Sequence, residues 1–172
     1  MVISGSISAN NYIQMPHPAS TLARSGLALT GRYIYVQLKA PATASPLSMH
    51  FDLQLADRSH NIRISASNLY KQFYTQNGMV LQVPLSLDIN RWTVAVFDIY
   101  NLLGSSGLLP PTYTIHGGYS IKSVTLCANC CVRGVYTSDN LYDFVTLPPE
   151  MRFKFSFDIS RWPENFAWLE LP

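Results

Sequence analysis

The feature of this sequence that most constrains its fold is a repeated alternation of apolar and polar side chains. The alternation recurs in five separate runs, at 33–39, 51–56, 62–65, 92–96 and 153–157. Successive side chains of a β-strand point to opposite faces of the sheet, so a period of two is typical of a strand with one buried face. These runs therefore predict an all-β chain.

Further strands are predicted where apolar residues cluster between Gly-, Pro- and Asn-containing turn signals, at 2–7, 12–15, 79–87, 120–127 and 132–136. Asn77-Gly78 favours a tight hairpin turn, because both residue types tolerate positive φ. Two short helices are expected, one over 67–74 with Ser67 as N-cap and one over 98–103 closed by Gly104. The fold class predicted is all-β, a jelly-roll-type β-sandwich of about ten strands with one or two short helices.

The length of 172 residues corresponds to one domain. We expect the β-sandwich to occupy residues 1–161. Residues 162–172 follow as a C-terminal strap or the start of a linker. The apolar residues of this tail are expected to pack onto the domain, and they are Phe166, Trp168, Leu169 and Leu171.

The charge content argues against several classes of function. The chain carries 12 Lys and Arg against 10 Asp and Glu, a formal net charge of +2. This balance disfavours nucleic-acid binding, which requires clustered cations to neutralise phosphates. The N-terminus lacks the features of a signal peptide, and no apolar run is long enough to span a bilayer, so no membrane partner is expected.

Three cysteines lie in one short cluster, Cys127, Cys130 and Cys131. An odd number in a single cluster is not a disulfide framework and indicates a reducing compartment. Cys127 and Cys130 have the spacing of half a zinc site, but no second pair of Cys or His accompanies them. Small buried residues in a core strand are the favoured interpretation over a metal or redox site.

No catalytic constellation is predicted. Asp139 and Asp143 could suggest a small metal site, but a turn with side-chain-to-backbone hydrogen bonds is the simpler interpretation. No nucleophile, base and orienting group can be assembled from the remaining residues. We therefore expect no enzymatic activity, no cofactor and no metal.

Two tyrosines alternate with the apolar residues of one predicted strand, Tyr33 and Tyr35. If this face is exposed, the rings could stack on sugars or form a protein interface. If loops or the tail cover the face, the rings belong to the core. Glycan binding through these residues is the alternative function, although the cysteine usage and the lack of a secretion signal count against it.

Several stretches resemble a known family. They are GSISANNYIQ at 5–14, LTGRYIYV at 29–36, IRISASNLYK at 62–71, RWT at 91–93, LCA at 126–128 and VRGVYTSD at 132–139. These stretches are similar to the domain of cilia- and flagella-associated protein twenty, and the similarity covers nearly the whole chain. Within that family they resemble the N-terminal domain of the centriolar WD-repeat proteins more than the small single-domain ciliary branch.

The resemblance implies a jelly-roll β-sandwich that binds microtubules in the wall of centrioles, basal bodies or cilia, at the inner junction between adjacent tubules. The implied partners are tubulin and other inner-junction proteins, with no nucleic acid and no membrane. The implied location is the cytoskeleton of the cytoplasm. Since the chain contains no propeller repeats, the resemblance also implies an N-terminal fragment that begins later than the family domain usually does.

Tubulin is strongly acidic, so a modest basic patch is enough to steer an encounter even at a net charge of +2. Four cations are predicted to contact tubulin, namely Arg32, Lys39, Arg152 and Lys154. Arg32 and Lys39 bracket one predicted strand. Arg152 and Lys154 share a face of another.

Overall fold

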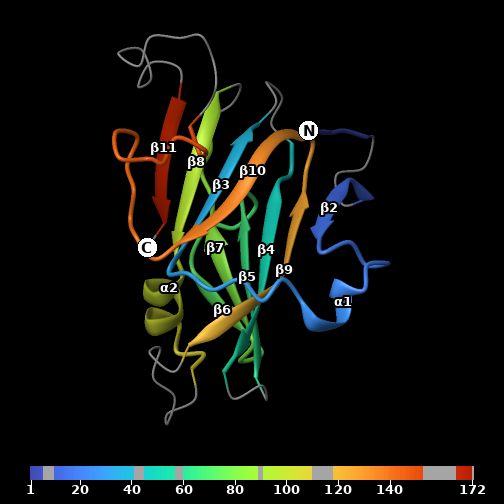
Figure 1. The fold of residues 1–172 in the computed structure, drawn as a ribbon. Helices are drawn as coiled ribbons and strands as arrows, with labels where there is room; N and C mark the ends of the chain where they lie inside the picture. The colour runs from blue at the N-terminus through green and yellow to red at the C-terminus, as the bar shows by residue number, and fades with distance from the viewer. Residues whose placement is uncertain are drawn as a thin grey trace.

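Two β-sheets pack face to face in the computed structural model of this chain (Figure 1). The structure describes residues 1–5, 10–40, 45–56, 60–88, 91–109 and 118–152, and the backbone of 166–171. In order, the elements are β1 (Val2–Ile3), β2 (Tyr12–Met15), α1 (Leu22–Ser25), β3 (Tyr33–Lys39), β4 (Ser48–Leu55), β5 (Asn61–Ser67), β6 (Tyr74–Gln76), β7 (Val80–Pro84), β8 (Trp92–Asp98), α2 (Ile99–Ser106), β9 (Tyr119–Cys127), β10 (Cys130–Ser138) and β11 (Phe166–Leu171).

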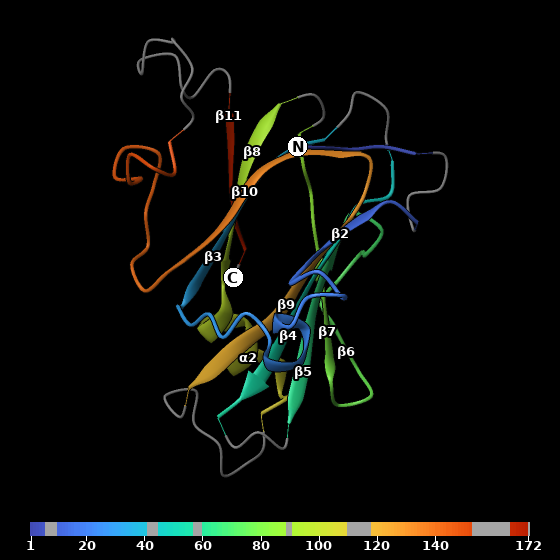
Figure 2. The ribbon, with the colours of Figure 1, turned by 45° about the vertical axis from the view of Figure 1, so that its right-hand side comes forward.

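The strand order confirms the predicted all-β sandwich. One sheet has five strands in the order β1-β10-β3-β8-β11, and the other has six in the order β2-β9-β4-β5-β7-β6. Figure 2 shows the two sheets as separate layers. Two neighbouring pairs are parallel, β5 with β7 and β8 with β11, and the other pairs are antiparallel. The tail segment β11 is thus an edge strand of the five-stranded sheet.

The core lies between the two sheets and follows from the alternating pattern. Along β4, every second side chain is buried and the others are partly exposed. Phe51 of β4 and Phe97 of β8 meet across the core, with ring centroids 4.8 Å apart and an interplanar angle of 63°. This edge-to-face geometry is the one that aromatic pairs prefer, and it joins the two sheets directly.

β3 departs from the alternating pattern because both of its faces are buried. Tyr33 and Tyr35 are 8% and 0% exposed. The segment that follows β10 covers them. The Tyr35 hydroxyl donates to the carbonyl of Asn140 at 2.9 Å and accepts from the backbone N–H of Tyr142 at 2.8 Å. An exposed aromatic face is therefore the wrong alternative, and these rings are not available to stack on a sugar.

The covering segment is shaped by turns of the kind predicted at Asp139 and Asp143. The Asp143 carboxylate accepts from the backbone N–H groups of Val145 and Thr146, both at 2.8 Å. The Asp139 carboxylate accepts from the backbone N–H of Arg32 at 3.2 Å. The Asp139 bond is a long-range contact, whereas the predicted local turn at 138–140 is confirmed by the Ser138 hydroxyl, which accepts from the backbone N–H of Asn140 at 3.0 Å.

One of the two helix predictions is wrong. Residues 67–74 form the end of β5, a turn and the start of β6. The Ser67 hydroxyl accepts from the backbone N–H of Leu69 at 3.2 Å, as a cap would, but only a turn follows, and the same hydroxyl donates to the carbonyl of Leu47 at 2.8 Å. Leu69 and Phe73 are exposed, so a helix here has no apolar face to bury.

The other helix and the hairpin turn are confirmed. The Asp98 carboxylate caps α2 by accepting from the backbone N–H of Asn101 at 3.1 Å. The helix continues past Gly104 and ends at Gly107, which has a φ of 68°. Asn77 and Gly78, with φ values of 51° and 65°, turn the chain between β6 and β7. No helix within the described ranges is long and apolar enough to cross a membrane.

Some predictions fall on residues that lie outside the description. These are the strand over 153–157, residues 6–7 of the strand predicted over 2–7, Lys154, and the side-chain packing of the tail.

Candidate functional site

The outer faces of the two sheets differ. The five-stranded sheet is covered on its outside by the segment 139–152, which packs on Tyr33 and Tyr35. The outer side chains of β4, from Ser48 to Gln54, all remain partly exposed. The outer face of the six-stranded sheet is therefore the more accessible one along β4, although Ser65 and Ser67 of β5 are buried there, and we call it the open face.

The centre of the open face is an ion pair that is held from both neighbouring strands. The Arg63 guanidinium on β5 donates to Asp52 on β4 at 2.6 and 3.0 Å, and the Ser123 hydroxyl on β9 donates to the same carboxylate at 2.6 Å. Burial alone raises the pKa of Asp52, but the hydrogen bonds from Arg63 and Ser123 outweigh it and hold that pKa below its ordinary value. The pair cross-links three strands of the open face.

This lowered pKa makes the stability of the fold depend on pH in a defined direction. A carboxyl group with a depressed folded pKa stabilises the protein above its unfolded pKa of roughly 4, and this stabilisation is lost as the pH falls through the folded pKa. Urea unfolding of the wild type should therefore lose more free energy between neutral and acid pH than unfolding of Asp52→Asn, which lacks the titrating group. Equal losses in both proteins would show that the pair contributes nothing.

Beside the ion pair lies a chain of hydrogen bonds through His50, Ser65 and Tyr70. The Ser65 hydroxyl is 2.9 Å from His50 Nδ1 and 3.0 Å from the Tyr70 hydroxyl. Burial and the positive charge of Arg63 lower the pKa of His50. A serine beside a histidine base is one requirement for nucleophilic catalysis, but Ser65 is only 3% exposed. The arrangement is therefore a structural network.

The cysteines lie where the chain passes from β9 to β10. All three are free, and among the described residues no group of three or more His, Cys, Asp or Glu could hold a metal. Cys130 is buried as predicted, whereas Cys127 and Cys131 are half-buried. Burial raises the pKa of the Cys130 thiol to about 11 and also raises that of Cys127. Both therefore stay protonated at neutral pH, which disfavours redox chemistry.

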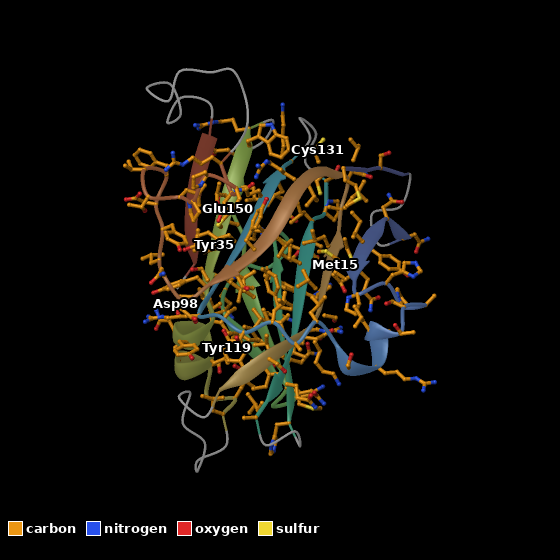
Figure 3. All side chains as sticks on the ribbon, in the orientation of Figure 1. Met15, Tyr35, Asp98, Tyr119, Cys131 and Glu150 are labelled. Carbon is orange, nitrogen blue, oxygen red and sulfur yellow. The ribbon has the colours of Figure 1, made fainter. Side chains whose placement is uncertain are left out.

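The structure does not bring the predicted tubulin-contacting cations into one patch. Lys39 is the last residue of β3 and Arg32 directly precedes its first, so the two lie about 23 Å apart at the usual rise per residue. Figure 3 labels a residue near each of them. Cys131 is the register partner of Lys39, and Asp98 is the register partner of Tyr33, the residue after Arg32. Lys154 lies outside the described residues.

Two of these cations also have partners within the domain. The Arg32 guanidinium bonds Asp98 at 2.7 Å and lies 5.0 Å from the ring centroid of Tyr33. The Arg152 guanidinium donates to the carbonyl of Leu147 at 2.6 Å and to that of Val145 at 3.3 Å. Both side chains are therefore oriented by their own domain.

Sequence reasoning missed the ion pair of the open face. The alternation does place Asp52 and Arg63 on the outward side of their strands, because both lie between buried apolar neighbours. Their pairing depends on the register of β4 against β5, in which Asp52 is directly opposite Arg63. Opposite charges at facing positions are a favourable cross-strand pair, but the register itself is not visible in the sequence.

Comparison with known proteins places the chain in a family. The model of the CFA20 domain matches residues 1–155. WD repeat-containing protein 90 of Mus musculus is 34% identical over 96% of the chain, and that of Homo sapiens is 34% identical over 82%. Centriole proteome protein 16 of Chlamydomonas reinhardtii is 30% identical over 97%. The chain spans only 7–9% of the length of these relatives. On these matches, the chain belongs to the CFA20 domain family.

Proposed function

We propose that this chain is a non-enzymatic microtubule-binding adaptor domain of the centriole or basal-body wall, acting at the inner junction between adjacent tubules. Its partners are tubulin and other inner-junction proteins. Membership of the CFA20 domain family supports this role, and a relative named as a centriole proteome protein supports the location. The corresponding location is the cytoskeleton of the cytoplasm, in centrioles, basal bodies and cilia.

The structural observation that carries the proposal is the difference between the two outer faces. One face is covered by the chain itself, and the other is open, polar and cross-linked by the pair Asp52–Arg63. A face whose polar side chains stay partly exposed can contact another protein through hydrogen bonds and charge pairs. We therefore place the tubulin contact on the open face.

Co-sedimentation with stabilised microtubules tests this placement. Thr125 faces His50 in the register of β9 against β4, near the middle of the open face. Thr125→Glu introduces a negative charge there, which should repel acidic tubulin and weaken pelleting about tenfold or more. The matched control is Val145→Glu, because Val145 is 64% exposed and lies on the segment that covers the other sheet. This control should pellet like the wild type.

The same assay separates the open face from the predicted cations. If Thr125→Glu pellets normally while Lys39→Glu and Lys154→Glu do not, the contact is not on the open face. If the wild type fails to pellet even at low salt, where electrostatic attraction is strongest, microtubule binding by this chain is contradicted. Thermal unfolding of each variant shows whether the fold is retained.

A further inference from the structure

A groove of about 710 Å³ opens at one end of the six-stranded sheet. It is bounded by the end of α1 with the loop after it, by the last residues of β4 and by the first residues of β9, close to Tyr119 in Figure 3. Its polar side chains are Arg24, Ser25, Gln54, Ser120 and Lys122. We call this the basic groove.

Local backbone structure builds the basic groove and fixes Lys122 in its wall. The register of β4 against β9 shifts between Asp52 and Leu53, so Lys122 is an extra residue in a β-bulge. A bulge redirects the side chain that it inserts. The loop after α1 is bound to the same place, because the backbone N–H of Leu27 donates to the carbonyl of Lys122 at 3.0 Å.

The loop can approach this closely because residue 26 is a glycine. Gly26 has a φ of 80°, and a Cβ atom there would lie 2.8 Å from the Cα of Lys122. Any side chain at this position would therefore push the loop away from β9. A second backbone bond, from the N–H of Ile121 to the carbonyl of Leu29 at 2.8 Å, holds the far end of the loop. The groove is thus preformed.

Among the residues that the structure describes, the charged side chains lining the basic groove are all cations. Arg24 and Lys122 line it, and no carboxylate does among the described residues. Neither Arg24 nor Lys122 forms an ion pair with another described residue. A smaller hollow of about 270 Å³ on the other side of Lys122 contains Asp52, but Arg63 and Ser123 already bond that carboxylate. The positive potential of the basic groove is therefore left for a ligand.

From these observations we propose that the basic groove binds an extended acidic peptide segment of a partner protein, with its carboxylates at Arg24 and Lys122. The hydroxyls of Ser25 and Ser120 line the groove as well and can donate to or accept from a peptide backbone. Two cations are too few for a nucleic acid, which needs many phosphate contacts. The polar lining does not suit the mainly apolar ligands that fill a typical small-molecule pocket.

The proposal does not rest on microtubule binding, and a direct titration tests it. The probe is a fluorescein-labelled peptide of alternating Glu and Gly, and fluorescence anisotropy measures its affinity. Arg24→Glu combined with Lys122→Glu should weaken binding about tenfold or more, since two attractions become repulsions. The matched control combines Lys71→Glu with Met79→Glu and Val145→Glu, three exposed positions away from the groove, which change the net charge equally. It should lose less than about threefold.

Each outcome decides the proposal. It is supported if only the groove variant loses the peptide and if the amide signals of Ser25 and Ser120 shift on titration of the wild type. It is overturned if the groove variant and the control variant lose affinity equally, or if the matched Gln-Gly peptide binds as tightly as the Glu-Gly peptide. Microtubule pelleting of the same proteins is scored separately, so a wild type that binds the peptide but does not pellet contradicts only the proposed function.

Discussion

Replacing Phe51 by alanine is expected to lower the free energy of unfolding by about 3–5 kcal/mol, the usual cost of truncating a fully buried phenylalanine. Phe51 and Phe97 are both 0% exposed, and their rings are in edge-to-face contact across the two sheets. Truncation leaves a cavity at the centre of the core. Because a domain of this size is stable by only about 5–15 kcal/mol, the loss is a large fraction of the total. Urea denaturation followed by circular dichroism measures it.

A double-mutant cycle isolates the contact between the two rings. The double variant with Phe97→Ala should be less destabilised than the sum of the two single variants by about 0.5–1.5 kcal/mol, the contribution of an aromatic pair. Phe51→Leu is the control that retains most of the apolar volume, and it should cost less than half as much as Phe51→Ala. A loss below about 1 kcal/mol for Phe51→Ala would contradict the placement of this ring at the centre of the core.

The strands were predictable because one face of each sheet must be buried. Phe51, Leu53 and Leu55 alternate with polar residues, and all three point into the core. The failed helix over 67–74 shows the limit of such reasoning. Ser67 resembles an N-cap and does accept from the backbone N–H of Leu69, but its hydroxyl also donates to the carbonyl of Leu47, twenty residues earlier in the chain. A contact of this kind is set by tertiary structure, which local propensity does not contain.

Two β-bulges that carry cations were not predicted from the sequence. One inserts Lys122 into β9 and the other inserts Arg133 into β10. Each has a trace in the sequence, because two residues separate the flanking apolar positions, Ile121 from Val124 and Val132 from Val135. In a regular strand only one residue separates two neighbouring side chains of the same face. The interruption locates a bulge, but the direction in which it turns the cation depends on the neighbouring segments.

The covered face of β3 was the least predictable part of the candidate site. Tyr33 and Tyr35 have the same pattern whether they face solvent or a covering loop. The cover comes from residues more than a hundred positions later, through the bonds of Tyr35 to Asn140 and Tyr142. Such long-range packing decides which outer face stays open. It therefore decides where a partner can bind, and the order of the residues alone does not reveal it.

The guanidinium of Arg133 fastens this cover to the sheet. It donates to the side-chain oxygen of Gln37, to the carbonyl of Met151 at 3.1 Å and to that of Arg152 at 2.6 Å. The Gln37 amide, which is fully buried, also donates to the carbonyl of Met151, at 2.6 Å. Hydrogen bonds from a charged group to buried acceptors are among the stronger contributions to stability.

We therefore expect Arg133→Met to lower the free energy of unfolding by about 3 kcal/mol, because the apolar side chain leaves several acceptors without a donor. Amide hydrogen exchange should accelerate most in 147–152, the part of the cover that Arg133 holds. Arg133→Lys keeps the charge but lacks the planar fork, so it should recover only part of the loss. If Arg133→Met were as stable as the wild type, or if exchange in 147–152 were unchanged, the hydrogen bonds of Arg133 would not be what holds this segment over the five-stranded sheet.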